Sequence, residues 1–335
     1  MAAHDGRMMT ALLQSGYGGP EALRVGSVPR PVPGPGQVLV RVAAASVNAR
    51  DWHLMRGDPW VARVMGADLR LRRPTVATRG TDFAGTVVAV GPDVISLAAG
   101  DEVFGEAVAA FAEFVLAPAA VVALKPANLS FAEAAALPLA ANTALIGIRE
   151  EADVRPGQRV LVNGASGGVG LFAVQLAHAG GAEVTAVCSA RNADLVREAG
   201  ADHVVDYART DFIRTGARHD VVLDLVGNRR LRHLLRAVRP GGTLVLSGGG
   251  VWTGGSVFGP MGLLLRSMLA RPFVRARVRQ LVAEPSTARL ATLRELAESG
   301  VLRPVIDRTY AMGQAAEAIR YLEVEHARAK VVLVA

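Results

Sequence analysis

Residues 159–181 read RVLVNGASGGVGLFAVQLAHAGG, and this stretch decides the fold of the chain. Residues 160–162 form the short apolar run that is typical of a buried parallel strand. A turn of small residues follows at once, and the helical pattern after it ends at Gly180 and Gly181. Strand, small-residue turn and helix in this order predict a dinucleotide-binding corner, because the backbone can approach a pyrophosphate whose charge the helix N-terminus then holds.

The motif alone is weak evidence, and two other interpretations compete with it. One is a glycine turn that binds nothing. The other is the nucleophile elbow of a serine hydrolase, Gly-x-Ser-x-Gly, centred on Ser166, for which Asp224 with His233 or His326 gives the required order of acid and base. The upstream oxyanion motif of that family is absent, so we favour the nucleotide. The residues expected to contact it are Ala165, Ser166, Gly167, Gly168, Val169 and Gly170.

Composition narrows the class of protein. The chain has 335 residues, enough for two domains, with 51% hydrophobic and 20% charged residues. Cys188 is the single cysteine, which excludes an internal disulfide and a cysteine-based metal cage and suits a reducing compartment. Residues 1–10 lack the apolar core of a signal peptide, so we expect a cytoplasmic protein.

The basic charge does not indicate nucleic acid. The net charge is +7, carried almost entirely by arginine, and no aromatic–basic platform accompanies it. Such a field would attract a phosphorylated cofactor. The uncharged run over residues 160–182 contains polar side chains and many glycines, so we expect no membrane span.

Two kinds of organisation follow each other along the chain. Short strands and Gly/Pro turns up to about residue 125, such as residues 37–46 and 86–91, predict a partly open β-barrel. From residue 157 strands alternate with helices, which predicts an α/β, doubly wound parallel sheet. The later strands are expected at residues 183–189, 203–206, 221–226 and 243–247.

Residues 262–282 combine leucine with arginine. No acidic residue lies between Asp224 and Glu284. The pattern predicts a basic helix, Gly262 to Val282, which packs at a domain or dimer interface or lies on a membrane surface.

Six blocks of the chain share their sequence and order with a known family: residues 45–52, 80–85, 99–105, 164–170, 199–204 and 326–332. In these blocks the chain resembles the zinc-independent, quinone-oxidoreductase-like branch of the medium-chain dehydrogenases/reductases. In the last block, Ala329 stands where the family usually has glycine. The resemblance implies a GroES-like barrel at residues 1–138 and 301–335, with a Rossmann domain inserted at residues 139–300. It also implies NADPH and reduction of quinones or enones, and we expect a homodimer.

Zinc-dependent relatives need cysteine and histidine ligands that are missing here. Val47 and Asn48 occupy the first ligand region, and Thr81 and Asp82 occupy the second. We therefore expect no metal.

The residues after the second Rossmann strand decide the choice of cofactor. An NAD site usually has an acidic residue there to bind the ribose, whereas this chain has Ser189 and Arg191, which suit a 2′-phosphate. By the resemblance, Tyr207 joins them, and Thr143 and Lys330 match other positions near the cofactor. The expected cofactor is therefore NADPH. Its nicotinamide should lie at the carboxyl ends of the later strands, near Leu225, Val226, Gly227, Ser247 and Gly248.

Three residues after the first barrel strand are candidates for the chemistry. Asn48 is expected to bind a carbonyl oxygen as negative charge develops, and His53 to supply a proton. Asp51 either joins them or only orients the loop, and water is an alternative proton carrier. The predicted activity is hydride transfer to a quinone or enone substrate. The alternatives are an NADP-dependent alcohol or aldehyde dehydrogenase and a non-enzymatic NADPH-binding protein.

Overall fold

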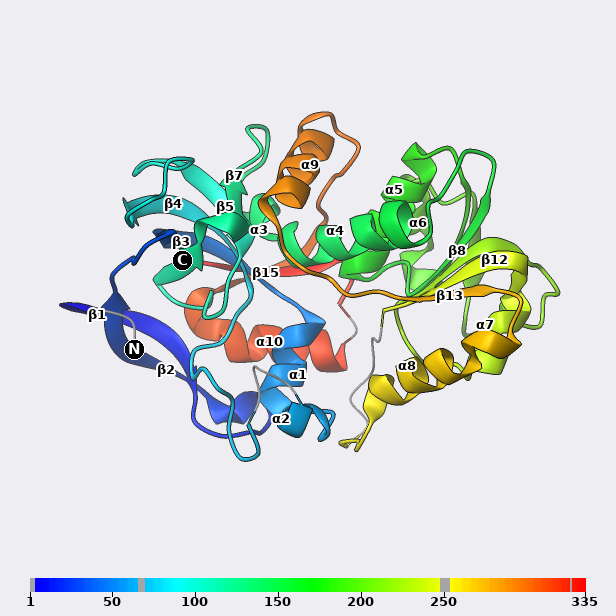
Figure 1. Cartoon of the computed structure of the whole chain (residues 1–335), viewed down its shortest axis with the longest axis horizontal. Helices are drawn as coiled ribbons and strands as arrows, with labels where there is room; N and C mark the ends of the chain where they lie inside the picture. The colour runs from blue at the N-terminus through cyan, green and yellow to red at the C-terminus, as the bar shows by residue number, and fades with distance from the viewer. Residues whose placement is uncertain (1–3, 66–69, 248–253, 326) are drawn as a thin grey trace. The chain divides into compact units, whose positions relative to one another are not determined.

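A computed structural model describes residues 4–65, 70–247, 254–325 and 327–335 (Figure 1). The chain forms two compact units: unit 1 comprises Met1–Asn142 and Glu284–Ala335, and unit 2 comprises Thr143–Ala283. None of the described helices is long and apolar enough to cross a membrane.

The division into compact units differs from the predicted domain boundaries, most at the second one. The boundaries lie after residues 142 and 283, where the sequence predicted 138 and 300. Helix α9 (Thr287–Glu298) therefore belongs to unit 1. Its C-terminal end is held there by hydrogen bonds, because Asn128 Nδ2 donates to Ala297 O at 3.0 Å and Ala127 N donates to Glu298 Oε1 at 3.1 Å.

Unit 1 is built on a seven-stranded sheet that forms a partly open barrel of the GroES type. Strand β3 (Gln37–Val47) is central, because it pairs antiparallel with three other strands and its Val38 and Val40 are fully buried. The strands run in the order β14-β15-β3-β4-β5-β7, with β6 also on β3, and β1 and β2 form a separate hairpin. The bounds are β1 (His4–Gln14), β2 (Leu23–Pro31), β4 (Asp82–Val90), β5 (Glu102–Glu106), β6 (Phe114–Pro118), β7 (Val122–Leu124), β14 (Ile306–Ala311) and β15 (Lys330–Val334).

Short helices connect the strands of unit 1. Helix α1 directly follows β3, and α4 runs across the division between the units. Besides α9, the α-helices are α1 (Ala49–Arg56), α2 (Ala62–Met65), α3 (Phe131–Ala135), α4 (Pro138–Leu145) and α10 (Ala315–Val324).

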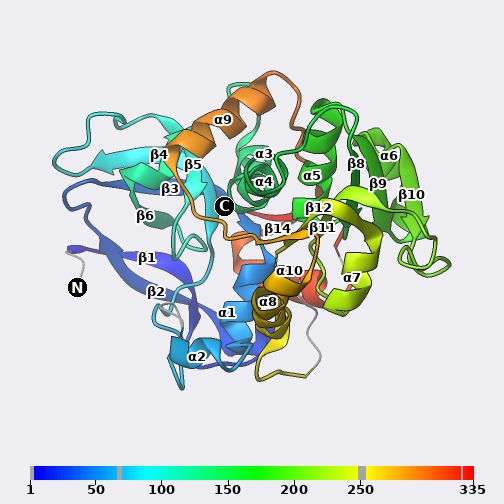
Figure 2. The same ribbon diagram turned by 45° about the vertical axis from the view of Figure 1, so that its right-hand side comes forward.

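Unit 2 is a doubly wound Rossmann sheet of six strands, all parallel, in the order β10-β9-β8-β11-β12-β13. The order reverses between β8 and β11, and ligands of such sheets bind outside the carboxyl ends at this point. Helices α5 and α6 cover one face, and α7 and α8 cover the other (Figures 1 and 2). The bounds are β8 (Arg159–Asn163), α5 (Gly168–Ala179), β9 (Glu183–Cys188), α6 (Ala193–Glu198), β10 (His203–Asp206), β11 (His219–Asp224), α7 (Leu231–Ala237), β12 (Val238–Leu246), α8 (Gly259–Ala270) and β13 (Arg277–Gln280).

The predicted basic helix at residues 262–282 is only half right. Helix α8 ends at Ala270, a 3₁₀ turn spans Arg271–Phe273, and β13 follows as the sixth strand of the sheet. Pro272 cannot continue a helix, and the alternation of Arg277, Val278 and Arg279 suits a strand with one buried side chain.

Candidate active site

The glycine corner of unit 2 has the geometry of an anion site. Gly164 has φ +87°, a conformation that glycine adopts without strain. A Cβ on Gly170 would lie 2.1 Å from Gly164 O, so only glycine allows α5 to start this close to the turn. Gly167, the N-cap, makes no side-chain hydrogen bond to the first turn of α5, and a Cβ there would lie in ordinary contact, 3.5 Å from Gly164 O. The N-terminus of this twelve-residue helix therefore has no side-chain cap, which suits a pyrophosphate.

Ser166 is tied to the neighbouring loop. Asn192, which is buried, donates from Nδ2 to Ser166 Oγ at 2.9 Å. The acid that a hydrolase would use, Asp224, accepts instead from Asn163 Nδ2 at 2.7 Å. Neither bond brings a histidine to Ser166, and His326 lies outside the described residues. Among the described residues, the nucleophile-elbow interpretation therefore lacks a base.

Ser189, Arg191 and Tyr207 are brought to one edge of the unit 2 sheet. Cys188 pairs with Asp206 at the ends of β9 and β10, and Tyr207 N donates to Cys188 O at 3.2 Å. Ser189 follows β9 at once, and Arg191 is exposed on the next turn. Hydroxyl and guanidinium groups in this position can hold a phosphate on the ribose.

The residues expected near the nicotinamide also lie at the carboxyl edge. Asp224 organises them, because its Oδ1 accepts from Val226 N and Gly227 N at 3.4 and 3.3 Å, and its backbone oxygen accepts from Ser247 N at 3.1 Å. Leu225 N donates to Asn163 O at 3.1 Å. Sequence reasoning missed Asp224 as the organiser of this edge.

Two other residues, Gly248 and Thr143, are also predicted to lie near the cofactor. Gly248 lies outside the described residues. Thr143 is buried on α4.

Unit 1 contains a buried polar cluster centred on Asp82. Oδ2 of Asp82 accepts from Ser46 Oγ and from Asn48 Nδ2, both at 2.9 Å, and Oδ1 accepts from Leu139 N at 3.1 Å. Lys330 Nζ lies 3.8 Å from Oδ2 and donates to Asn48 Oδ1. Both charged side chains are almost inaccessible to solvent. Burial raises the pKa of Asp82 and lowers that of Lys330, and the mutual attraction of the two charges opposes both shifts.

This cluster changes the roles expected for Asn48 and Lys330. The amide nitrogen of Asn48 also donates to Ser46 O at 3.3 Å, so its donors face Asp82 and the backbone in place of a substrate oxygen. Lys330 is an ion-pair partner inside unit 1. Sequence reasoning missed Asp82 because its block carried only the family resemblance.

Asp51 faces the same region from α1. Its Oδ2 accepts from Asn48 N at 2.7 Å and so caps the helix, while its Oδ1 accepts from Thr81 Oγ1 at 3.3 Å. Burial raises the pKa of Asp51 to about 7, and the charge of Asp82 adds to the rise. Asp51 therefore holds a proton for part of the time at neutral pH.

His53 is turned toward a backbone carbonyl. Its Nδ1 lies 3.0 Å from Asp58 O, and its ring stacks on Trp52. A carbonyl can only accept, so Nδ1 carries the proton and Nε2 of the neutral ring is an acceptor. Burial lowers the pKa of His53. A neutral imidazole of this tautomer has no proton to give at Nε2, which differs from the expected donor role.

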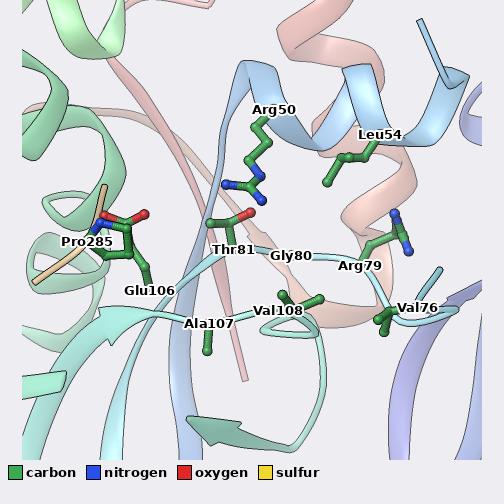
Figure 3. A pocket seen from close by; sticks show the side chains of 10 residues that line it. All are labelled: Arg50, Leu54, Val76, Arg79, Gly80, Thr81, Glu106, Ala107, Val108 and Pro285. Carbon is green, nitrogen blue, oxygen red and sulfur yellow. The ribbon is translucent and has the colours of Figure 1, made fainter. Parts of the chain in front are cut away.

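A cavity of about 240 Å³ lies in unit 1 beside Thr81 (Figure 3). Figure 3 shows Arg50 and Leu54 reaching down from α1 toward it, with Glu106 and Pro285 at one end and Val76 and Arg79 at the other. The remaining wall residues are Gly80, Thr81, Ala107 and Val108.

Glu106 is the acid of this cavity, and sequence reasoning did not single it out. It is buried, and Asn142 Nδ2 lies 3.5 Å from its Oε1. Burial raises the pKa of Glu106 to about 8, the charge of Asp82 adds to the rise, and Asn142, Arg50 and Lys330 oppose it. The carboxyl group is therefore mostly protonated at neutral pH.

No cluster of three or more His, Cys, Asp or Glu side chains among the described residues is arranged to hold a metal ion.

Two family models match the chain. Residues 34–127 match the alcohol dehydrogenase GroES-like domain, and residues 199–333 match a family described as zinc-binding dehydrogenase.

Similar proteins cover almost the whole chain. A chloroplastic quinone oxidoreductase of Triphysaria versicolor is 31% identical over 98% of this chain and 99% of its own. A chloroplastic NADPH-dependent alkenal/one oxidoreductase of Arabidopsis thaliana is 32% identical over 97% of this chain and 79% of its own. Among solved structures, the quinone oxidoreductase of Coxiella burnetii superposes with a TM-score of 0.83 at 29% identity, covering 98% of this chain and 100% of that one.

Proposed function

Because this chain belongs to the medium-chain dehydrogenase/reductase family, we propose that it is an NADPH-dependent oxidoreductase that reduces a quinone or an α,β-unsaturated carbonyl compound without a metal ion. The observation that carries the proposal is the unit 1 cavity beside the Asp82 cluster. In that cluster the cation is the ammonium of Lys330, which already lies against the oxygens of Asn48 and Asp82. Lysine here supplies the positive charge that a metal ion would otherwise bring.

The cavity has apolar walls beside its charged groups and so suits a substrate with both a ring or alkyl part and a carbonyl group. Leu54, Val76, Val108 and Pro285 give apolar walls, and such walls favour a ring or an alkyl chain. Thr81 lines the cavity, and its hydroxyl, which donates to Asp51 Oδ1 when that carboxyl is ionised, can donate to a carbonyl oxygen when Asp51 is protonated. The names of the two relatives, a quinone and an alkenal/one oxidoreductase, agree with this chemistry.

The preference for NADPH rests on the end of β9. Ser189, Arg191 and Tyr207 would hold the 2′-phosphate, and Asp206 at the end of β10 accepts from Ala208 N in its own turn at 3.1 Å. One hydrogen bond to a charged group is worth about 1.5–3 kcal/mol, which favours NADPH over NADH by about tenfold or more. When bound, the reduced nicotinamide supplies a hydride.

Reduction of an enone also needs a proton on the α-carbon, and Glu106 is the group we assign to it. A hydride at the β-carbon leaves an enolate, and the Glu106 carboxyl transfers its proton to the α-carbon. The resulting carboxylate regains a proton from solvent. Reduction of a quinone needs no protein acid at this position, because its reduced oxygens take protons directly from water.

An acceptor panel tests the proposal. The enzyme should consume NADPH, and NADH more slowly, with 1,2- or 1,4-quinones or with α,β-unsaturated ketones. Oxidation of alcohols with NADP⁺ at a higher rate would favour the dehydrogenase alternative. Cofactor binding with no turnover on any acceptor would favour the non-enzymatic one.

Glu106→Gln tests the assignment of the proton. The variant should lose about 100-fold in kcat for an enone, the size of a general-acid contribution, while the rate with a quinone changes little. Glu102→Gln is the control, because Glu102 lies on the same strand and is exposed. Equal losses on both substrates would mean that Glu106 only shapes the cavity.

A further inference from the structure

Arg50 brings a positive charge to the wall of the unit 1 cavity. It lies in the first turn of α1, and Leu54 follows four residues later, so the two side chains share one face of the helix. Both line the cavity, and Figure 3 shows them reaching down from α1 toward it. Arg50 is half-buried. This face of α1 therefore supplies the cavity with one apolar side chain and one guanidinium group.

The other side of α1 fixes the backbone that carries Arg50. Trp52 and Met55 are buried, and the carboxyl group of Asp51 caps the helix by accepting from Asn48 N at 2.7 Å. The guanidinium group therefore projects from a turn that is held in place. A cation in the first turn of a helix also opposes the helix dipole, so helix stability does not explain an arginine at this position.

The charge of Arg50 lies close enough to Glu106 to act on its proton. Burial raises the pKa of Glu106, and the charge of Arg50 is among those that oppose the rise. Arg79, the other arginine of the cavity wall, lies at the end away from Glu106 (Figure 3). In an enone the carbonyl oxygen is only two bonds from the α-carbon, to which Glu106 is assigned. The cation that can serve this oxygen is therefore Arg50.

The polar groups first expected to bind this oxygen are engaged elsewhere. The amide nitrogen of Asn48 donates to Asp82 and to the backbone, and Lys330 lies against the oxygens of Asn48 and Asp82. The hydroxyl group of Thr81 lines the cavity but carries no charge. Arg50 keeps its charge throughout a reaction, because arginine is not deprotonated in proteins, and its N–H groups only donate.

We propose that Arg50 binds the carbonyl oxygen of the substrate and holds the negative charge that hydride transfer places on it. When a hydride adds to the β-carbon of an enone, the electrons of the C=C bond move toward the carbonyl oxygen, and a guanidinium N–H donates to this oxygen. The charge leaves the oxygen when the α-carbon takes the proton of Glu106. The inference rests on the proposed function for the reaction, and it favours substrates whose reduction passes through an oxygen anion, as that of enones and quinones does.

Binding of 4-nitrophenol tests this role without cofactor or turnover. Its anion carries negative charge on an oxygen conjugated with a flat ring, and it absorbs at a longer wavelength than the neutral phenol. At a pH where the free compound is partly neutral, the full-length protein should bind it as the anion. Arg50→Gln should raise the Kd about tenfold or more, the effect of one hydrogen bond to a charged group, and the bound phenol should keep its proton. Arg50→Lys keeps the charge and should bind the anion more tightly than Arg50→Gln.

Turnover gives a second signature, if the proposed reaction takes place. Arg50→Gln should lower kcat about 100-fold with an enone and with a quinone alike, because the oxygen of both becomes negative. Glu106→Gln should lower it with the enone alone. A variant Arg50→Gln that reduces both acceptors as fast as the wild type would overturn the proposal.

Arg73→Gln is the matched control, because Arg73 is exposed in unit 1 and lies outside the cavity wall, so the same charge is lost elsewhere. This control should bind 4-nitrophenol like the wild type, and circular dichroism reports that the variants are folded. The proposal fails if Arg50→Gln binds the anion as tightly as the wild type, or if the wild type binds only the neutral phenol or none. A protein that binds the anion through Arg50 and reduces no acceptor keeps this oxygen site and refutes the proposed reaction alone.

Discussion

Lys330→Met should destabilise unit 1 by about 4 kcal/mol. The substitution removes the cation that lies 3.8 Å from Asp82 Oδ2 in a site closed to solvent. With an effective dielectric constant of about 20, a charge pair at this distance contributes about 4 kcal/mol. This agrees with the roughly 3–5 kcal/mol lost when one partner of a buried pair is removed.

Protonation of Asp82 limits this loss and gives it a pH signature. In the variant, Asp82 can take up a proton, which becomes easier by about 1.4 kcal/mol for each pH unit below neutral. The difference in stability between wild type and variant should therefore shrink as the pH falls. Combining Lys330→Met with Asp82→Asn removes both charges of the pair, so the double variant should recover more than half of the loss.

Urea unfolding followed by tryptophan fluorescence measures these differences. Trp52 is buried in unit 1, and a Trp252→Phe background removes the tryptophan of unit 2. Arg294→Met is the control, because Arg294 and its partner Glu298 are both partly exposed on α9 of unit 1 and such pairs contribute about 1 kcal/mol or less. A loss below about 1 kcal/mol for Lys330→Met, or additive losses in the double variant, would refute the ion pair as the centre of the cluster.

Three further predictions concern other parts of the chain. Enone reduction should fall about tenfold between about pH 7 and about pH 9, because Glu106 loses its proton as the pH rises through about 8; a flat profile would exclude it as the acid. Arg191→Ala should raise the Kd for NADPH about tenfold and leave that for NADH unchanged in a binding titration, and equal effects would contradict the phosphate contact. Ala329→Gly should stabilise the protein in thermal unfolding by about 1 kcal/mol, because Ala329 has φ +57°, whereas Ala311→Gly, at φ −65°, should destabilise it.

The sequence predicted those parts of the molecule that depend on local order. The run at residues 160–162 and the small residues after it form a strand, a turn and a helix start, because spacing and residue size act locally. The Ala329 position shows the same: a departure from the family's glycine coincides with a left-handed backbone. The prediction of one helix over residues 262–282 is wrong because Arg277, Val278 and Arg279 have no helical signal of their own. Pairing with β12 holds them in a strand.

The buried charged residues of unit 1 could not be predicted from local sequence patterns. Asp82, Glu106 and Lys330 lie on three different strands, and their meeting depends on the long-range register of the barrel. Their properties are also collective, since burial and the charge of Asp82 together raise the pKa of Glu106. A single-sequence pattern contains neither the register nor the burial.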